Sequence, residues 1–359
     1  MVQVHSLRDV IAAETALSDV DGEHGRLTYR GRAVGDLVER HSFEEAAHLL
    51  WTGRLPTAEE SEWLRAAFAK GRSWAAEVFP VIDRLPTTVN ATDAASVGLL
   101  SLPEPNATTN QVEQAAMHCA ALATFVLRHF GNQHGQDYRP PETEEGYSSA
   151  FLRGLHGVKP SASQVTTLDA YFILTMEHSL NASTFAARVT TSTRATMNRA
   201  LVSAIATMSG ELHGGAPKEV IGMFEAIGTA DAAPEWMEQQ LAQGKRIMGF
   251  GHRVYRTIDP RAAALKHMLL SERPDDPEVR FALSVEQAAQ LALQQHKPGR
   301  SLYPNVEFWA ACLLRSLGIP KSLYTATFCC SRVVGWTAHI MEQAACDTLI
   351  RPKAVYVNA

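Results

Sequence analysis

Two histidines lie in glycine-rich segments whose chemistry suits the binding of an anion. His213 stands in Leu212-His-Gly-Gly-Ala216, and His252 stands in Gly249-Phe-Gly-His-Arg-Val-Tyr255. Glycine next to histidine at a helix break lets a substrate approach the backbone and leaves amides free to bind negative charge. Either motif alone also fits a histidine in an ordinary turn. The second motif is not a dinucleotide fingerprint, because it lacks a third glycine and a preceding strand.

An acid stands at the start of an apolar helix in Tyr303-Pro-Asn-Val-Glu-Phe-Trp309. Glu307 falls in the first turn, where a carboxylate interacts favourably with the helix dipole. Its neighbours Phe308 and Trp309 are aromatic, and an acid in apolar surroundings has a raised pKa that suits proton abstraction. The sequence therefore leaves a helix-dipole role and a general-base role open for Glu307.

Three arginines complete the candidate set. Arg261 follows an Asp-Pro pair, Arg332 follows Cys-Ser, and Arg351 precedes a proline. Each alone fits a surface or ion-pair arginine. If the three guanidiniums converge, they would bind a dicarboxylate through bidentate hydrogen bonds.

The elements that must position these residues are helical. Ser42 with Glu45 and Thr57 with Glu60 fit the capping box, and Asp259 before a proline marks another helix start. Segments rich in Ala, Leu, Met and Gln, which have high helix propensity, predict long helices. These lie at about 109–131, 161–178, 196–210, 217–228, 260–271, 277–296, 306–317 and 322–346. The predicted fold class is all-α with two helical domains.

Strand signals are sparse. Residues 26–30 alternate between glycines and predict at most a short N-terminal β-hairpin, and 354–357 predict an extended tail. Strands and helices do not alternate, which disfavours a doubly wound sheet. Gly/Pro-rich breaks predict a small helical domain, 215–318, inserted in a large one, 1–214 and 319–359. An inserted domain can move, and a ligand cleft is expected between the two.

Composition excludes several classes of protein. The 359 residues are 46% hydrophobic and 20% charged, as in a folded globular chain. The formal net charge of -5 argues against nucleic acid or an anionic membrane as a partner, but it leaves room for a local basic pocket. No apolar run is long enough to span a membrane, and the N-terminus lacks signal-peptide features. Five scattered cysteines without a Cys-x-x-Cys pair predict a reduced, cytoplasmic protein.

Taken together, the motifs resemble those of the citrate synthase family, in its short bacterial and archaeal type. The resemblance runs from Leu7 to about Tyr356. It rests on Leu27-Thr-Tyr-Arg-Gly31, Glu177-His-Ser-Leu-Asn-Ala-Ser-Thr-Phe185, Leu212-His-Gly-Gly-Ala216, Gly249-Phe-Gly-His-Arg-Val-Tyr255 with Asp259-Pro-Arg261, Asn305-Val-Glu307, Gly335-Trp-Thr-Ala-His339 with Glu342, and Arg351-Pro352. It implies an all-α homodimer whose small domain, on the acyl-CoA side, closes on substrate. The implied reaction condenses oxaloacetate with acetyl-CoA and hydrolyses the thioester to citrate and CoA, without metal or redox cofactor.

The resemblance also implies three catalytic roles. His213 is expected to hold the thioester carbonyl and stabilise the enolate, and His252 to polarise the oxaloacetate ketone and protonate the alkoxide. Glu307 stands where the family normally has an aspartate as general base. Its extra methylene moves the carboxylate by about 1 Å, and a displacement of that size can cost about 100-fold in rate. We therefore expect an active enzyme that is slower than its aspartate-bearing relatives.

The remaining expected roles concern binding. By resemblance, oxaloacetate is bound by His178, Arg261 and Arg332, and Arg351 reaches across the dimer into the partner subunit's site. Three basic residues are the candidates for binding the CoA phosphates, on the basis of their charge alone: Arg256, Lys297 and Arg300. No metal site is expected, because the histidines lack His-x-x-x-His spacing and a nearby acid at ligand spacing.

Three functions remain open at this point. Citrate synthase is the leading one. A 2-methylcitrate synthase, which uses propionyl-CoA, would share every residue named above, although Trp309 beside Glu307 leaves less space and favours acetyl. A non-catalytic paralogue that binds dicarboxylate or CoA is suggested by the substituted base. The retention of both histidines and all three arginines argues against the paralogue.

Overall fold

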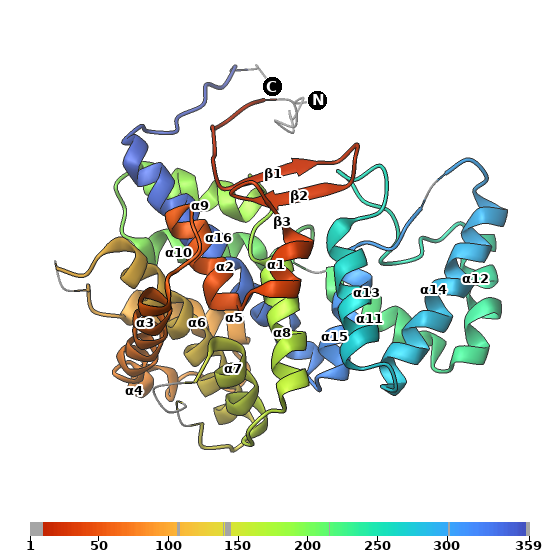
Figure 1. Cartoon of the computed structure of the whole chain (residues 1–359), viewed down its shortest axis with the longest axis horizontal. Coiled ribbons are helices and arrows are strands. Elements are labelled where there is room, and N and C mark those ends of the chain that lie inside the picture. Colours follow the sequence, from red (N-terminus) through yellow and green to blue (C-terminus); the bar gives the residue numbers. More distant parts are fainter. Residues whose placement is uncertain are drawn as a thin grey trace.

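Helix α16 (Tyr324–Cys346) is the central buried helix in the computed structural model of the chain (Figure 1). All of its residues from Ala326 to Ile340 are buried, and other helices pack against it on several sides. The structure describes residues 10–105, 108–138, 140, 145–214, 216–300 and 302–356.

The other helices follow in chain order. Before residue 214 they are α1 (Val34–Arg40), α2 (Phe43–Thr52), α3 (Ala58–Ala76), α4 (Phe79–Ile82), α5 (Ala91–Ser101), α6 (Gln111–Gln133), α7 (Tyr147–His156), α8 (Ala162–Thr175), α9 (Ala182–Ser192) and α10 (Met197–Met208). After it they are α11 (Ala216–Ile227), η1 (Ala230–Ala232), α12 (Ala233–Ala242), α13 (Pro260–Glu272), α14 (Pro277–His296), α15 (Val306–Ser316) and η2 (Lys321–Leu323). The predicted all-α class is confirmed, and the long predicted helices match to within a few residues. The sequence signals did not predict α1, α4, α5, α7, α9 and α12.

The predicted helix starts follow local capping chemistry. The Ser42 hydroxyl accepts from the Glu45 amide while the Glu45 carboxylate accepts from the Ser42 amide, and Thr57 and Glu60 repeat the arrangement. Asp259 caps α13, which begins with a proline. Each cap satisfies amides that would otherwise lack partners at a helix N-terminus.

A small antiparallel sheet lies near the N-terminus. Its strands are β1 (Ser18–Asp21), β2 (Arg26–Tyr29) and β3 (Arg32–Ala33), in that order across the sheet. Val20 pairs with Leu27, and the side chain of Leu27 is buried. The predicted hairpin is therefore present, and a third strand of two residues extends it.

Helices α11 to α15 pack on one another and form the right-hand part of the molecule in Figure 1. Helix α11 and helix α13 contact α15, and α12 contacts α14. Helices α13 and α15 also contact α8, which connects this group to the rest of the chain. In sequence, these helices run from Ala216 to Ser316, within the range 215–318 that was predicted as a small domain.

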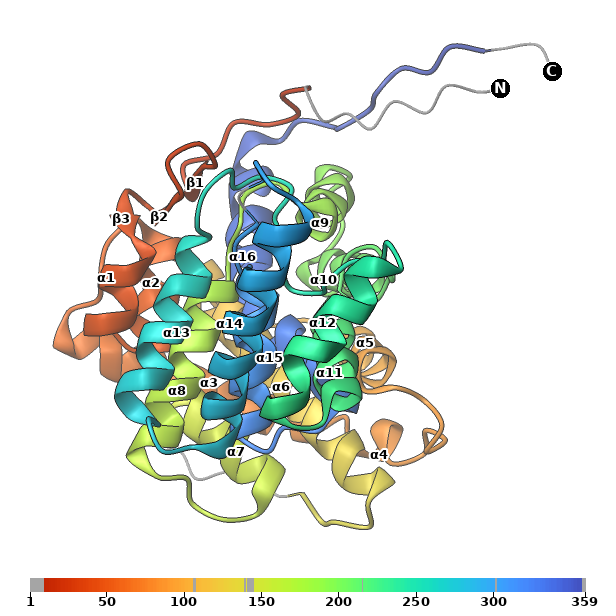
Figure 2. The same cartoon turned by 90° about the vertical axis from the view of Figure 1, so that its right-hand side faces the viewer.

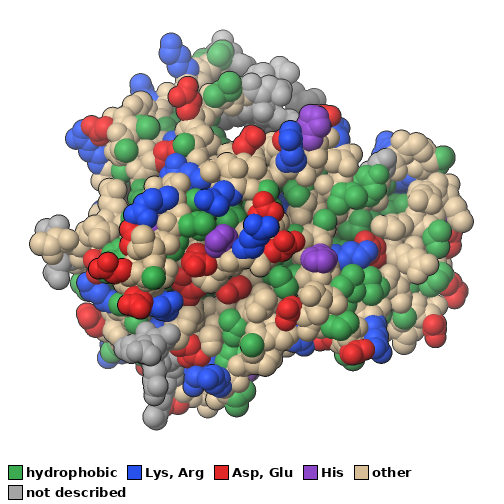
Figure 3. Space-filling model, in the orientation of Figure 1, with side chains coloured by type: hydrophobic (Ala, Val, Ile, Leu, Met, Phe, Trp, Pro, Cys, Tyr) green, Lys and Arg blue, Asp and Glu red, His purple; other side chains and the backbone are tan. Residues whose placement is uncertain are grey.

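The chain beyond α16 extends away from the helices, on the same side as the segment before β1 (Figures 1 and 2). Acidic and basic side chains are interspersed over the face drawn in Figure 3. Four of the five cysteines are buried, and Cys346 is exposed. Within the part of the chain that the structure describes, no helix combines the length and apolar character that a membrane crossing needs.

Candidate active site

His252 lies in the loop between α12 and α13, and its backbone contacts fix which ring nitrogen carries the proton. The amides of Val254 and Tyr255 both donate to Nδ1, at 3.0 and 3.1 Å. Burial, reinforced by the nearby Arg261 charge, lowers the pKa of the ring to about 4, so the imidazole is neutral near pH 7. Because Nδ1 accepts, the single proton lies on Nε2, which is then a hydrogen-bond donor.

Arg261, in the first turn of α13, places a second donor beside His252. Its guanidinium bonds twice to Asp259, from Nε to Oδ1 at 3.1 Å and from Nη2 to Oδ2 at 2.9 Å. Nη2 also lies 3.3 Å from His252 Nε2. Both nitrogens are donors, so they do not bond each other. Because they lie so close together, one ligand oxygen could accept hydrogen bonds from both. Asp259 further accepts the amide of Val306 at 3.1 Å, which connects this cluster to the residue before Glu307.

His178 reaches the same cluster from the loop between α8 and α9. Its Nε2 lies 3.1 Å from the Tyr255 hydroxyl, and its ring centroid lies 6.0 Å from that of His252. Burial, together with the charges of Arg261 and Arg332, holds the pKa of His178 well below its usual range. The ring is therefore neutral, and it can bind a ligand oxygen without adding charge to a site that already holds two guanidiniums.

Arg332 lies in the buried middle of α16. Its Nε donates to the carbonyl of Thr175 at 2.7 Å, which anchors the guanidinium at the end of α8. Among the described residues, no hydrogen bond uses its Nη groups. The positive charge acts on His178, Arg261 and Glu307. A guanidinium held through Nε keeps both Nη groups for a carboxylate.

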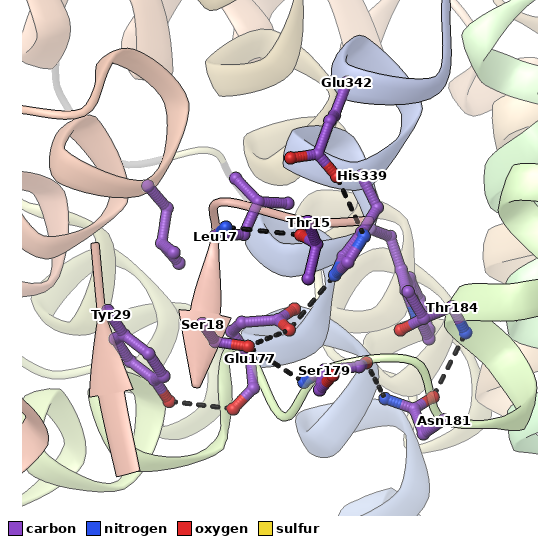
Figure 4. Close-up of polar contacts among 12 residues, drawn as sticks. Thr15, Leu17, Ser18, Tyr29, Glu177, Ser179, Asn181, Thr184, His339 and Glu342 are labelled. Atoms are coloured by element: carbon purple, nitrogen blue, oxygen red, sulfur yellow. Dashed lines mark hydrogen bonds and ion pairs between the residues drawn. The ribbon is translucent and has the colours of Figure 1, made fainter. Parts of the chain in front are cut away.

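Buried polar contacts hold the loop that carries His178 (Figure 4). The Glu177 carboxylate accepts from the Ser18 hydroxyl at 2.9 Å and lies 3.1 Å from His339 Nε2. The Tyr29 hydroxyl donates to the Glu177 carbonyl at 2.9 Å. The loop is thus attached on one side to the sheet and on the other to α16.

His213, at the break before α11, is oriented by Ser183 at the start of α9. The Ser183 amide donates to His213 Nε2 at 3.2 Å, and the Ser183 hydroxyl lies 2.8 Å from the same nitrogen. Trp336 Nε1 donates to that hydroxyl at 3.1 Å. Burial and the charge of Arg332 lower the pKa of His213 to about 4. Because an amide can only donate, Nε2 accepts and the proton lies on Nδ1, which is the nitrogen of this ring that can donate a hydrogen bond.

Glu307 lies in the first turn of α15 and lines a cavity of about 450 Å³ together with His252. Burial raises the pKa of this carboxyl to about 7, against the opposing effect of the Arg261 charge. A carboxylate whose pKa lies near the working pH is suited to take a proton from a substrate. Of the two roles that the sequence leaves open for Glu307, this environment favours the general base.

The cavity that holds Glu307 is strongly basic. Its lining includes four cationic side chains from the loop after α12 and the end of α14, which are Arg246, Arg253, Lys297 and Arg300. Two of them, Lys297 and Arg300, are sequence-predicted CoA-binding residues. Arg253, although it adjoins His252, and Arg246 were missed. The third predicted CoA residue, Arg256, lies outside this cavity on the exposed surface, 3.6 Å from Glu23.

Trp309 does not line the cavity of Glu307. It lines a separate cavity of about 380 Å³ with Lys266, whose ammonium lies 5.4 Å from the ring centroid of Trp309. Residues two apart on a helix point to different sides. The structure therefore removes the argument that Trp309 narrows the space beside Glu307 and so favours an acetyl group.

Arg351 is not brought to the other site arginines within one chain. It lies in the exposed segment beyond α16, which extends away from the helices (Figures 1 and 2). Among the residues that the structure describes, no group of three His, Cys, Asp or Glu side chains is arranged to hold a metal ion.

The turn between β1 and β2 fixes the loop that carries His252. The amide of Arg256 donates to the Gly22 carbonyl at 2.9 Å, and a Cβ atom added to Gly22 would lie 2.4 Å from the Val254 carbonyl oxygen. This close approach requires glycine, because the backbone of the loop is the obstacle.

We predict that Gly22→Ala displaces this loop and lowers kcat/KM for the anionic substrate by about tenfold, since small displacements of catalytic groups are costly. Gly35→Ala is the matched control, because a Cβ there meets no atom within 4 Å. Steady-state kinetics of both variants test this. Equal kcat/KM values for the two variants would contradict a positioning role of the turn.

These contacts bring together, in an all-α protein, a buried carboxyl group of raised pKa, neutral imidazoles and two buried arginines. Comparison with known proteins gives its family. The family model described as "Citrate synthase, C-terminal domain" matches residues 6–353. The chain therefore belongs to the citrate synthase family and is an enzyme of the acyltransferase kind.

Similar proteins cover almost the whole chain. A citrate synthase of Saccharolobus solfataricus is 34% identical over 98% of this chain and 95% of its own length. A 2-methylcitrate synthase of Shewanella oneidensis is 36% identical over 98% and 94%. The citrate synthase of Thermoplasma acidophilum, solved in a ternary complex with carboxymethyl coenzyme A and oxaloacetate, aligns with a TM-score of 0.86 at 30% identity over 98% and 95%.

Proposed function

We propose that the protein condenses oxaloacetate with acetyl-CoA and hydrolyses the resulting thioester to citrate and CoA. One observation carries this proposal: Glu307, whose pKa is about 7, shares a basic cavity with His252. A carbon acid as weak as a thioester methyl group needs a base that is ionised near neutral pH and a donor aimed at the developing oxyanion.

The first step is enolisation. The Glu307 carboxylate removes a proton from the methyl carbon of acetyl-CoA, and the thioester oxygen gains negative charge. His213, whose proton lies on Nδ1, donates to that oxygen from a fixed position, because Ser183 holds its other nitrogen. A neutral donor with a low pKa stabilises the enolate without itself becoming an imidazolium.

The second step forms the carbon–carbon bond. The enolate carbon attacks the ketone of oxaloacetate, whose oxygen lies within reach of the convergent donors His252 Nε2 and Arg261 Nη2. His252 then gives its Nε2 proton to the alkoxide and recovers a proton from the acid form of Glu307, which lines the same cavity and returns to a carboxylate. Water hydrolyses the citryl thioester and releases CoA. The two carboxylates of oxaloacetate have complementary partners in Arg261 and Arg332.

The assembly and the environment belong to the same proposal. The protein acts as a homodimer in which Arg351 completes the oxaloacetate site of the partner subunit. The exposed position of Arg351 in one chain supports this arrangement. Closure of residues 215–318 onto the larger domain, 1–214 and 319–359, would exclude water from the enolate. In this proposal the reaction needs neither metal nor redox cofactor. It takes place in the cytoplasm.

Measurement must decide whether acetyl-CoA or propionyl-CoA is the preferred substrate, because citrate synthases and 2-methylcitrate synthases are about equally similar to this chain. We expect kcat/KM, with oxaloacetate saturating, to be higher for acetyl-CoA. Loss of thioester absorbance is the appropriate signal, since the exposed Cys346 would react with a thiol reagent. A preference for propionyl-CoA would reassign the protein as a 2-methylcitrate synthase. If neither thioester is consumed although oxaloacetate binds, the protein is a non-catalytic relative.

The length of the base gives a separate prediction. If Glu307 is displaced relative to the family aspartate, Glu307→Asp should raise kcat by about tenfold, towards the rate of aspartate-bearing relatives. Turnover of the two proteins side by side, at a pH above both carboxyl pKa values, tests this. An unchanged or lower rate in Glu307→Asp would show that the cavity is built for the longer side chain.

A further inference from the structure

Arg188, on α9, is a buried guanidinium that the reaction described above does not use. Only 2% of its surface is exposed. Its Nε donates to Gln343 Oε1 at 3.0 Å, and its Nη1 donates to Glu342 Oε2 at 2.5 Å. Nη1 also lies 3.0 Å from His339 Nδ1. The planar guanidinium therefore holds three side chains of α16 in one fixed arrangement.

One branch of these contacts leads to the loop of His178. A guanidinium can only donate, so His339 Nδ1 accepts from Arg188 and the ring proton at Nε2 points to Glu177. Glu177 immediately precedes His178, and it is fully buried, as is His339 (Figure 4). The position of His178 is thus connected to Arg188 through two buried side chains.

The other branch leads to the segment of Arg351. Gln343 accepts from Arg188 at Oε1 and donates from Nε2 to the Thr348 carbonyl at 3.1 Å. At the end of the helix that carries Arg188, the Ser192 hydroxyl accepts the amide of Ile350 at 3.1 Å. Ile350 directly precedes Arg351, so both contacts fix the chain where it leaves α16.

We infer that Arg188 is a positioning residue for oxaloacetate binding, which fixes the loop of His178 and the segment of Arg351 relative to each other. The inference rests on the proposed function, in which His178 acts in its own subunit's site and Arg351 acts in the partner's. One buried guanidinium then connects oxaloacetate-binding groups of the two sites of a dimer. Buried hydrogen-bonded groups transmit such constraints because packed interiors do not deform continuously.

Gln343→Met is the most selective probe, because it removes the link to Thr348 while Arg188 keeps its bonds to Glu342 and His339. Loss of this link should weaken oxaloacetate binding about fivefold, the usual effect of one hydrogen bond. Calorimetric titration of the dimer with oxaloacetate measures the Kd without turnover. The KM for acetyl-CoA should stay within about twofold of the wild-type value. A general loss of stability would instead weaken the binding of both substrates.

Two further variants are compared with Gln343→Met, one with a larger expected effect and one with none. Arg188→Lys keeps the charge but cannot hold the three partners together, and we expect about a tenfold weaker Kd for oxaloacetate. Arg194→Gln is the matched control. It breaks the exposed ion pair of Arg194 with Asp347, at the same junction between α9 and the segment beyond α16, and an exposed pair contributes little. Its Kd should equal that of the wild type.

A double-mutant cycle with Arg351→Gln decides the inference. If Gln343 acts by positioning Arg351, Gln343→Met should have no additional effect in the Arg351→Gln background. A wild-type Kd in Gln343→Met, or an effect that multiplies with that of Arg351→Gln, would overturn the inference alone. If the wild type binds no oxaloacetate, the proposed function fails. If Arg351→Gln binds as tightly as the wild type, the cross-subunit role of Arg351 fails and the inference fails with it.

Discussion

Glu307→Gln is expected to lower kcat by about 1,000-fold, within the range that a positioned general base contributes. Glutamine matches the size of glutamate and keeps its place in the cavity with His252, but it cannot accept a proton from the thioester methyl group. Steady-state turnover with oxaloacetate and acetyl-CoA measures the loss. The Kd for oxaloacetate should stay close to that of the wild type, because the proposed oxaloacetate partners are His178, His252, Arg261 and Arg332.

The pH dependence of kcat/KM tests whether the loss of rate is due to the carboxyl group of Glu307. The pKa of Glu307 is about 7, whereas those of His213 and His252 are about 4. Only the ionised carboxylate is a base, so kcat/KM of the wild type should rise with pH and level off above about 7. At pH 6 about a tenth of Glu307 is ionised, and the rate should be about tenfold lower. This limb should disappear in Glu307→Gln, whereas Glu225→Gln, an exposed carboxylate on α11, should keep it. A limb that persists in Glu307→Gln would belong to another base.

His213→Ala is expected to lower kcat by about 100- to 1,000-fold, the usual cost of one lost oxyanion donor. The proton on Nδ1 is the proposed donor to the thioester oxygen, and Ser183 occupies the other nitrogen. His213→Asn should recover part of the rate, because its amide places an N–H near the position of Nδ1. Rapid-quench turnover of the three proteins measures this order.

Oxaloacetate binding is the control for the His213 variants. Since His213 is proposed to act on the thioester, the Kd of oxaloacetate should be the same in the wild type and in both variants. Equal rates for His213→Ala and the wild type, or a loss of oxaloacetate binding in His213→Ala, would contradict the assigned role.

Most of the helical architecture could be predicted from the sequence because its signals are local. The capping boxes at Ser42 and Thr57 and the Asp-Pro pair at Asp259 specify helix starts within a few residues of the chain. The short β3 strand carries no comparable signal. It pairs with β2 through backbone hydrogen bonds, which residues of almost any type can form.

Most of the site residues and their expected roles could be singled out from the sequence, but the tautomers of the histidines and the sides that the side chains face could not. The tautomer of His213 depends on a Ser183 amide that lies far away in the chain, and that of His252 depends on how its own loop folds back. Glu307 and Trp309 line two different cavities, and which side of α15 faces the cavity of His252 depends on how the helix packs. Arg246 lines the cavity because of the path of the loop after α12, which no local pattern specifies.

The activity proposed for this chain joins oxaloacetate to an acetyl group and releases CoA. The direct test is to incubate the purified protein with oxaloacetate and acetyl-CoA at pH 8 and to quantify citrate and CoA by mass spectrometry. We predict citrate and CoA in equal amounts, and no release of CoA when oxaloacetate is omitted. Release of CoA without oxaloacetate, or without an equal amount of citrate, would show that the protein does not catalyse this condensation.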